Sequence, residues 1–245
     1  MRMGQVIIAG LGPGTEVMIT PEVSAALANA TDIIGYIPYV ARIAAREGVT
    51  LHPSDNRAEL ERANLALRLA SEGARVVIVS SGDPGVFAMA AAVFEVLENT
   101  APELRDLDIR VLPGITAMLA AAAAAGAPLG HDFCAINLSD NLKPFDLVLK
   151  RVGLALQGDF AMAFYNPRSA SRHAQFASVL KLLRARAEPT RLVVLARAVS
   201  TPAQQVRTLA LAELEAEMVD MRTMMIVGSS LTRQVGRFTY TPRWA

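Results

Sequence analysis

The sequence has little cysteine, few lysines and almost no net charge. Cys134 is the only cysteine among 245 residues, which excludes an intramolecular disulfide, a Cys-x-x-Cys redox pair and a thiolate-ligated iron–sulfur cluster within the chain. Of the 24 basic residues, only Lys143, Lys150 and Lys181 are lysines. With 23 acidic side chains the net charge is +1, which argues against general nucleic-acid binding. We expect a protein of a reducing, cytoplasmic compartment.

Long apolar runs are also missing. The run at 6–9 is too short for a signal-peptide core, and the alanine-rich stretch at 118–125 falls well short of the roughly 20 residues that a membrane span needs. We therefore expect no membrane partner. Hydrophobic residues still make up 52% of the chain. The composition is that of a folded protein with a sizeable core.

Short runs rich in Val and Ile alternate with longer segments of helical periodicity. Most of these runs are apolar throughout, as in parallel strands covered on both faces, and their alternation with helices predicts an α/β fold. Pro and Gly residues interrupt the middle of the chain, so we expect two α/β domains, 1–114 and 115–245, with a cleft between them. The predicted strands are 5–11, 31–36, 75–80, 108–112, 133–138, 160–165, 191–196 and 223–228.

Local signals predict where two helices begin and end. Thr20 followed by Pro21 predicts a helix from residue 21 to residue 30. Asn56 and Glu59 have the spacing of a capping box, and Gly73 stands where a left-handed C-terminal cap is expected. The second helix would then lead into the strand at 75–80.

A glycine-rich turn, Gly-Leu-Gly-Pro-Gly at 10–14, follows the first predicted strand. A dinucleotide fingerprint would need glycine where Thr15 stands, and an acidic residue at the end of the second strand, which ends in Gly35 and Tyr36. Pro13 also removes a backbone donor from the turn. These departures disfavour nicotinamide binding, and the segment is either another kind of ligand loop or a plain tight turn.

Two further turns follow predicted strands. Residues 80–87, Ser-Ser-Gly-Asp-Pro-Gly-Val-Phe, lie where ligands bind in open parallel sheets, although Asp83 could instead cap a helix that begins near Pro84. Thr116 follows the turn at 113–114, and its hydroxyl could face a ligand or cap the alanine-rich helix. Local chemistry leaves both choices open.

Two arginines follow the strand at 160–165. Arg168 and Arg172 are four residues apart at the start of a predicted helix, where the dipole and the free amides favour an anion. Guanidinium groups bind carboxylates in a bidentate manner that lysine cannot match. A solvated surface pair is the alternative, and a bias toward GC-rich codons is the simpler explanation of the excess of arginine.

In this order and spacing, the turns resemble those of one family, the tetrapyrrole methylases, which are S-adenosylmethionine-dependent enzymes of the corrin and sirohaem pathways. The resemblance extends over essentially the whole chain. The turns at 10–14 and 82–85 are shared across the family, whereas the stretches at 126–133, 136–140 and 165–169 are most similar to members that methylate a precorrin.

The resemblance implies two α/β domains with S-adenosylmethionine in the cleft between them, no metal, and a homodimer. S-adenosylhomocysteine is the product that it implies. The substrate would be a tetrapyrrole fringed with carboxylates, which we expect Arg168 and Arg172 to bind, with Arg197 and Arg233 as further candidates. The residues that the resemblance assigns to the cofactor are Pro13, Ser81, Gly82, Asp83, Val86, Phe87, Thr116, Ala117, Asn166 and Val199.

The implied activity is methylation of precorrin-3B at C17, with contraction of the ring to precorrin-4, in cobalamin biosynthesis. Contraction requires proton transfers, and we nominate His131 for them because imidazole titrates near neutrality. A structural hydrogen bond is the alternative role of His131. It is too far in sequence from His52 and His173 to predict a metal site.

Three other functions remain open. A sibling enzyme would methylate cobalt-factor III in the anaerobic route, or another precorrin position. A protein methylase similar to diphthine synthase shares the fold but lacks the stretches at 136–140 and 165–169. A non-catalytic adenosine-binding module would show no transfer, so turnover of labelled S-adenosylmethionine with precorrin-3B distinguishes these functions.

Overall fold

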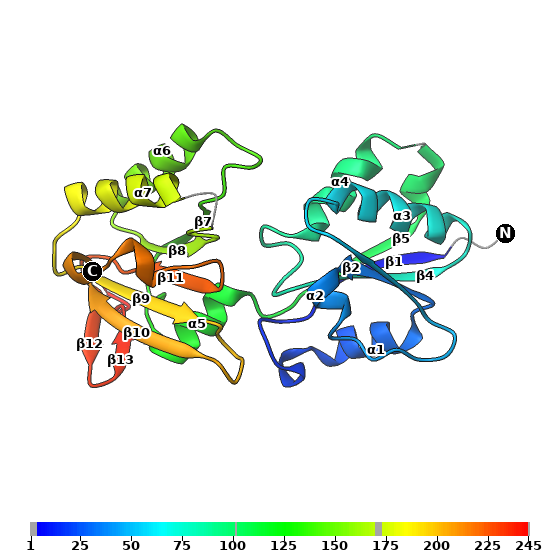
Figure 1. Ribbon diagram of the computed structural model, residues 1–245, viewed down its shortest axis with the longest axis horizontal. Coiled ribbons are helices and arrows are strands. Elements are labelled where there is room, and N and C mark those ends of the chain that lie inside the picture. The colour runs from blue at the N-terminus through cyan, green and yellow to red at the C-terminus, as the bar shows by residue number, and fades with distance from the viewer. Residues whose placement is uncertain (1–3, 101, 170–172, 245) are drawn as a thin grey trace. The chain divides into compact units, whose positions relative to one another are not determined.

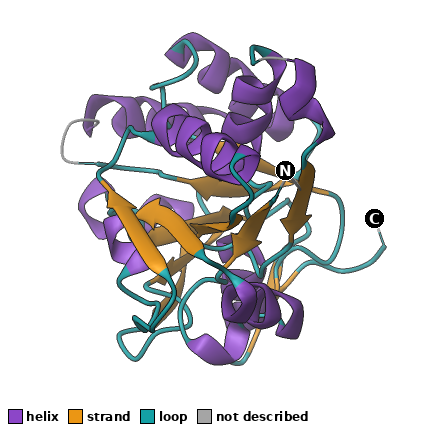
Figure 2. Ribbon diagram, turned by 90° about the vertical axis from the view of Figure 1, so that its right-hand side faces the viewer, coloured by secondary structure: helices purple, strands orange, loops and turns teal. Residues whose placement is uncertain are grey.

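The structure is a computed structural model that describes residues 4–100, 102–169 and 173–244. The chain divides into two compact units, Met1–Thr116 and Ala117–Ala245 (Figure 1). Each unit contains strands covered by helices (Figure 2). The division falls in the turn that leads into the alanine-rich helix, and the domain boundary expected from the sequence lies in the same turn.

The N-terminal unit is built on a five-stranded parallel sheet. Its strands are β1 (Gln5–Gly10), β2 (Asp32–Tyr36), β3 (Thr50–Ser54), β4 (Arg75–Ser80) and β5 (Asp108–Leu112). Its helices are α1 (Pro21–Asn29), α2 (Ile37–Val40), α3 (Glu59–Ser71) and α4 (Met89–Glu98), with 3-10 turns at Glu16–Met18 and Pro102–Asp106. The strand order is β3-β2-β4-β1-β5.

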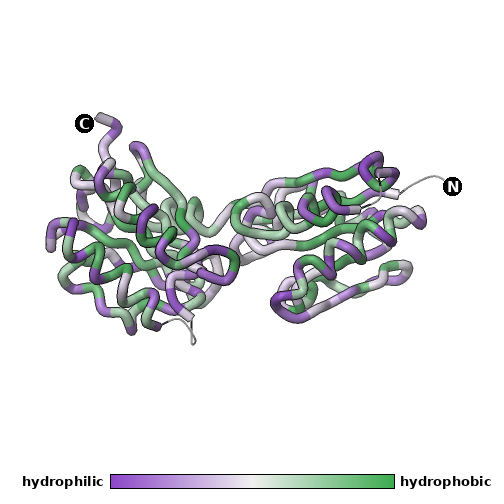
Figure 3. The backbone as a smooth tube through the Cα atoms, turned by 90° about the horizontal axis from the view of Figure 1, so that it is seen from above, coloured by the Kyte–Doolittle hydropathy of each residue, from purple (hydrophilic) through white to green (hydrophobic). Residues whose placement is uncertain are grey.

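Helices cover both faces of this sheet (Figure 1). Val6 and Ile8 of β1 pack with α3 and α4 on one face. Ile7 and Ala9 point the other way and pack with α1 and α2. Because successive residues of a strand face opposite sides, burial on both faces makes the whole strand apolar. Figure 3 shows green, hydrophobic stretches alternating with purple ones along the chain. The predicted parallel strands are confirmed for this unit.

The C-terminal unit contains a second five-stranded sheet and a small three-stranded one. Its strands are β6 (Gly126–Ala127), β7 (Phe133–Asn137), β8 (Ala161–Tyr165), β9 (Leu192–Arg197), β10 (Gln205–Ala210), β11 (Thr223–Val227), β12 (Arg233–Val235) and β13 (Phe238–Tyr240). Its helices are α5 (Ala117–Ala125), α6 (Phe145–Gln157) and α7 (His173–Arg186), with 3-10 turns at Leu211–Glu213 and Ala216–Met218.

The prediction of parallel strands is wrong for much of this second unit. The larger sheet has the order β10-β9-β11-β8-β7, in which β7 and β8 are parallel but β11 runs antiparallel to both β8 and β9. Every residue of β11 is buried, because α5 covers one face of the sheet and α6 and α7 cover the other. A continuous apolar run therefore reports burial on both faces and carries no information about strand direction.

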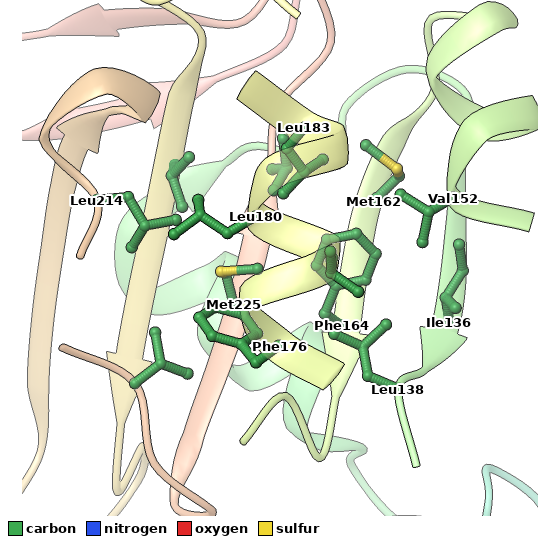
Figure 4. Packing of buried hydrophobic residues seen from close by; sticks show 14 of the residues in the cluster. Ile136, Leu138, Val152, Met162, Phe164, Phe176, Leu180, Leu183, Leu214 and Met225 are labelled. Atoms are coloured by element: carbon green, nitrogen blue, oxygen red, sulfur yellow. The ribbon is translucent and has the colours of Figure 1, made fainter. Parts of the chain in front are cut away.

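The core beneath α6 and α7 is formed by large side chains. Phe164 of β8, Phe176 of α7 and Met225 of β11 meet there, and all three are fully buried (Figure 4). On the opposite face, the alanines of α5 pack against β8, β9 and β11. Their small size lets the helix lie close to the sheet. Among the described residues, no helix has the length and apolar character that crossing a membrane requires.

Two of the predicted helix ends are confirmed. Thr20 is the N-cap of α1, with its Oγ1 accepting a hydrogen bond from the Val23 amide at 3.3 Å, and Pro21 occupies the first turn. Gly73 follows α3 with a left-handed φ of 98°, which a residue with a side chain adopts only at a cost.

The predicted capping box at the start of α3 is wrong. Asn56 Oδ1 accepts a hydrogen bond from the neighbouring Arg57 amide at 3.1 Å, and the helix begins only at Glu59 after Ala58. Arg57 has a φ of 66°, so the chain turns in the left-handed region directly after Asn56. The helix therefore cannot begin from that residue.

Candidate active site

The carboxyl ends of the first sheet carry one group of predicted cofactor residues. The strands are all parallel, so the turns after them lie along one edge. The chain leaves β1 on the face of α1 and leaves the adjacent β4 on the face of α4. Turns that separate in this way mark the topological switch point at which open α/β sheets bind ligands. The predicted cofactor residues that lie in the turns after β1, β4 and β5 are Pro13, Ser81, Gly82, Asp83, Val86, Phe87 and Thr116.

Three glycines bring these turns into backbone contact. A Cβ atom on Gly114 would lie 2.2 Å from the carbonyl oxygen of Gly82, and one on Gly10 would lie 2.6 Å from the same oxygen. Gly12 and Gly82 also exchange backbone hydrogen bonds of 3.2 and 2.9 Å. Side chains are therefore excluded from this point of contact, where main-chain atoms of the turns meet.

Asp83 ties two of the turns together. Its Oδ1 accepts a hydrogen bond from the Gly85 amide at 2.8 Å, and its Oδ2 accepts one from the Gly114 amide at 3.1 Å. The alternative role as a helix cap at Pro84 is wrong, because α4 begins only at Met89. The carboxylate fixes the spacing between the turn after β4 and the turn after β5.

Phe87 has an unusual conformation in the same turn. Its φ is 53° and its side chain is 50% exposed. A bulky residue with a left-handed backbone is uncommon, and such strain is concentrated at functional sites. The conformation presents an aromatic ring at the edge where the resemblance predicts a cofactor contact.

Arg42 was not predicted from the sequence, yet it holds the turn that contains Pro13. Its Nη2 donates hydrogen bonds to the carbonyl oxygens of Leu11 at 2.9 Å and Gly14 at 2.7 Å. Burial lowers the pKa of Arg42, which Tyr39 and Glu16 partly oppose. No local sequence signal joins Arg42 to a turn about 30 residues earlier, so only the fold reveals the contact.

Two tyrosines extend this edge beyond β2. The rings of Tyr36 and Tyr39 pack edge to face, with centroids 5.3 Å apart. Burial raises the pKa of Tyr39, as does the neighbouring Tyr36, whereas Arg62, Arg42 and the side chain of Ser81 lower it. The hydroxyl of Tyr39 is therefore a neutral group close to a predicted cofactor residue.

The second sheet carries the other predicted cofactor residues. Asn166 follows β8, and its Nδ2 donates a hydrogen bond of 3.2 Å to Oδ1 of Asn137, the last residue of β7. Val199 follows β9 and is buried in the same cluster as Ala117 and Tyr165. The structure thus brings Ala117, Asn166 and Val199 to one region of the C-terminal unit.

The backbone is strained at the same turns. Asn166 has a φ of 49°, and Ala198 and Ser200, on either side of Val199, have φ values of 49° and 62°. Because left-handed conformations are unfavourable for residues with side chains, they are retained where the surrounding structure enforces them. Strained turns therefore occur in both units at positions predicted to bind the cofactor.

The predicted substrate arginines have protein partners. Arg168 donates a 3.4 Å hydrogen bond to the Val219 carbonyl and lies 3.7 Å from Glu217, while its Nε is buried with no partner among the described residues. Arg172 lies outside the described residues. Arg197 pairs with Asp220 at 2.8 Å. The guanidinium of Arg233 lies 5.3 Å from the ring centre of Trp244.

His131 lies at the opposite edge of its sheet from the other predicted site residues of the C-terminal unit. It precedes β7, whereas Asn137, Asn166 and Val199 lie at or beyond the carboxyl ends of their strands. The length of β7, roughly 13 Å, therefore separates the two edges. His131 Nδ1 lies 3.9 Å from the exposed Asp132. Within the described ranges, no three His, Cys, Asp or Glu side chains gather as metal ligands would.

Comparison with known proteins identifies the family. The chain matches the Tetrapyrrole (Corrin/Porphyrin) Methylases over residues 5–215. It is 44% identical to Precorrin-3B C(17)-methyltransferase from Sinorhizobium sp, over 98% of this chain and 97% of that protein. It is 35% identical to the Probable cobalt-factor III C(17)-methyltransferase of Salmonella typhimurium, over 96% of this chain and 97% of that protein.

Solved structures agree with this assignment. The crystal structure of the methyltransferase CobJ has a TM-score of 0.95 and 66% sequence identity, covering 98% of this chain and 100% of that one. Uroporphyrin-III C-methyl transferase from Thermus thermophilus, solved with S-adenyl homocysteine, has the same fold, with a TM-score of 0.68 and 22% identity over 92% of each chain. The chain therefore belongs to the tetrapyrrole (corrin/porphyrin) methylase family.

Proposed function

We propose that this protein methylates precorrin-3B at C17, using S-adenosylmethionine, and contracts the ring to give precorrin-4 in cobalamin biosynthesis. The observation that carries the proposal is the 44% identity, over nearly the full length of both chains, to the precorrin-3B enzyme of Sinorhizobium. The turns at the carboxyl edge of the first sheet support it, because they lie at the switch point where such folds bind ligands.

The residues at this edge fit an adenosyl sulfonium compound. Gly10 and Gly114 leave no room for a Cβ atom beside the Gly82 carbonyl oxygen, so at this point of the edge the turns offer a ligand main-chain oxygens and amides. Carbonyl oxygens suit a sulfonium cation, and amides and carbonyls suit a neutral adenine. The residues proposed to hold the compound are Pro13, Ser81, Gly82, Asp83, Val86, Phe87 and Thr116, together with Ala117, Asn166 and Val199 of the C-terminal unit.

When bound, S-adenosylmethionine supplies a methyl group activated by the adjacent positive sulfur. Methyl transfer is an in-line displacement, so the protein contributes mainly by fixing the geometry and excluding water. Asp83 fixes the spacing between the turns after β4 and β5, and Arg42 holds the turn that contains Pro13, both through hydrogen bonds to main-chain groups. Val86 and Phe87 supply apolar surface. A ring carbon made nucleophilic by conjugation with ring nitrogens needs no strong base.

The substrate carries acetate and propionate groups, and we propose that Arg168 and Arg172 bind some of them. A charged hydrogen bond of this kind contributes about 1.5–3 kcal/mol to binding. The existing partner of Arg168, Glu217, is 77% exposed and 3.7 Å away, so this ion pair is weak. If Arg168→Ala binds precorrin-3B as tightly as the parent protein, this role is wrong.

Turnover under anaerobic conditions tests the function directly. Purified protein is incubated with methyl-labelled S-adenosylmethionine and either precorrin-3B or cobalt-factor III, and the products are analysed by mass. We expect one added methyl on precorrin-3B and little on cobalt-factor III, because identity to the cobalt-factor III enzyme is lower, 35% against 44%. Preferential methylation of cobalt-factor III, or no transfer to either, contradicts the proposal.

We also propose that the protein acts in the cytoplasm as a homodimer, as the family resemblance implies, with a small-molecule tetrapyrrole as its partner. Light scattering after size-exclusion chromatography measures the mass against the 26.1 kDa of one chain. A mass equal to that of one chain across the working concentration range contradicts the dimer.

A further inference from the structure

Arg62 of α3 is a buried cation whose hydrogen-bond partners are all neutral. Its side chain is only 4% exposed. Nε donates to Ser54 Oγ at 2.6 Å, Nη2 donates to the Asp55 carbonyl oxygen, and Nη1 lies 3.7 Å from Met89 Sδ. Among residues 4–100, 102–169 and 173–244, no carboxylate forms an ion pair with this guanidinium.

Arg191 shows how this protein accommodates an equally buried guanidinium elsewhere. Arg191 is 7% exposed and forms ion pairs with Asp159 at 2.9 Å and Glu188 at 2.7 Å. Removing a charge from water is costly unless an opposite charge and hydrogen bonds compensate it. Arg191 has both kinds of compensation, whereas Arg62 has the hydrogen bonds and lacks the anion.

The groups around Arg62 lie at the carboxyl edge of the first sheet. Its guanidinium carbon is 6.0 Å from the ring centre of Tyr36, which ends β2. Ser54 ends β3, and Tyr36 packs against Tyr39, which interacts with the side chain of Ser81 after β4. The uncompensated charge is therefore next to tyrosine and serine hydroxyls, which donate hydrogen bonds to carboxylate oxygens.

We propose that Arg62, Tyr39 and Ser81 form a carboxylate-binding subsite, in which the ligand supplies the anion that the protein lacks at Arg62. The inference rests on the proposed function for the ligands available. Two of them carry carboxylates: S-adenosylmethionine in its amino-acid part, and the macrocycle in its acetate and propionate arms. Arg62 provides the attraction. Tyr39 and Ser81 hydrogen-bond to each other through their side chains, which uses one of their two hydroxyl protons, and the other proton is donated to a ligand oxygen.

The two sources are distinguished by adenosine ligands that differ in the amino-acid part. S-adenosylhomocysteine carries this part, with its carboxylate, and methylthioadenosine lacks it, so calorimetry with both ligands measures the contribution of the amino-acid part to binding, and the Arg62 variants report how much of that contribution depends on the guanidinium. The KM for precorrin-3B, measured in turnover, reports on the macrocycle. The variants are Arg62→Gln, Arg62→Lys and Tyr39→Phe. The matched control is Arg68→Gln, since Arg68 lies on the same helix with its side chain 61% exposed.

If the carboxylate of the methyl donor binds here, Arg62→Gln weakens the binding of S-adenosylhomocysteine by about 10- to 100-fold and leaves the affinity for methylthioadenosine unchanged. If a macrocycle carboxylate binds here, the KM for precorrin-3B rises by a similar factor with both adenosine ligands unaffected. In either case we expect a smaller loss for Arg62→Lys than for Arg62→Gln, because lysine keeps the positive charge. Tyr39→Phe also gives a smaller loss than Arg62→Gln, because it removes only one hydroxyl group from the subsite.

The proposal is overturned if a folded Arg62→Gln changes neither the ratio of the two adenosine affinities nor the KM. Should Arg62→Gln fail to fold, as judged by circular dichroism, Arg62→Lys and Tyr39→Phe decide by the same measurements. If the parent protein does not methylate precorrin-3B, the proposed function is wrong, but the subsite is still tested by the two adenosine ligands. In that case the subsite proposal is overturned if Arg62→Gln leaves the ratio of the affinities for S-adenosylhomocysteine and methylthioadenosine unchanged.

Discussion

Replacing Gly114 by alanine tests whether the contact between the turns at the carboxyl edge positions the methyl donor. The added Cβ would lie 2.2 Å from the Gly82 carbonyl oxygen and 2.8 Å from the Gly10 carbonyl oxygen. Both are backbone atoms that no side-chain rotation can move. Gly114 does not have a left-handed φ, so the effect of the substitution is one of space and not of backbone conformation.

The distances set the size of the effect. An ordinary contact between carbon and oxygen is longer than 3 Å, so the turns after β4 and β5 must separate by about 1 Å to accept the methyl group. Overpacking of this kind costs about 1–3 kcal/mol of stability, which corresponds to a fall in Tm of roughly 2–4 °C per kcal/mol for a chain of this size. A 1 Å displacement of positioning groups can also lower the rate by roughly 100-fold.

Three measurements check this prediction. Thermal unfolding gives the loss of stability, calorimetry gives the affinity for S-adenosylhomocysteine, and turnover with precorrin-3B gives kcat. Gly85→Ala is the control, because its Cβ would meet only the end of the Asp83 side chain, at 3.2 Å. A Gly114→Ala protein that binds S-adenosylhomocysteine and turns over like the Gly85→Ala protein would refute the role of the contact.

Other substitutions test single contacts. Arg42→Ala removes the two hydrogen bonds to the turn that contains Pro13, so we expect an affinity for S-adenosylhomocysteine lower by about 10-fold or more, with unchanged circular dichroism. An affinity equal to that of the parent protein would show that these hydrogen bonds do not position the turn for the ligand. His131→Ala leaves methylation and contraction unchanged, measured by product mass and absorbance, whereas loss of contraction alone would restore its predicted role. Partial burial acts to raise the pKa of Asp159, but Ser230 and Arg191 outweigh it and hold that pKa below 3.8. The interaction stabilises the fold at neutral pH and is lost as pH falls through the lowered pKa. We therefore expect Asp159→Asn to lower Tm at pH 7 and to make Tm fall less steeply as the pH is lowered into the acid range. Parallel plots of Tm against pH for the parent protein and the variant would contradict this.

The strands of the core could be predicted because burial on both faces leaves a strong local pattern. The predicted range 75–80 coincides with β4, in which every residue after Arg75 is buried, and the predicted range 223–228 contains the fully buried β11. Of the strands that were not predicted, β3 and β10 lie at sheet edges and expose polar or charged residues. The others, β6, β12 and β13, are only two or three residues long. Direction depends on which strand a segment meets, so the antiparallel position of β11 was not readable from its apolar sequence.

The turns of the candidate site were also predictable, because glycine, proline and aspartate mark a strand end through local backbone chemistry. The side chains that hold those turns were not. Arg42 contacts residues 28 and 31 positions away in sequence, and Arg62 reaches Met89 27 positions away. Contacts of this range arise only when the sheet assembles, so no local pattern in the sequence marks either arginine.

The excess of arginine over lysine has a structural use that the carboxylate interpretation missed. Arg46 donates from two nitrogens to the carbonyl oxygens of Leu27, Ala28 and Ala30, which close the C-terminal end of α1. Its five donors in a planar fork can satisfy several diverging carbonyl groups at once, whereas an ammonium group bonds from a single point. Arg42 holds a turn in the same way. Many of the arginines therefore fix the protein's own backbone, and the guanidinium that stands out as suited to a ligand carboxylate is Arg62, because its charge is buried and its bonds are neutral.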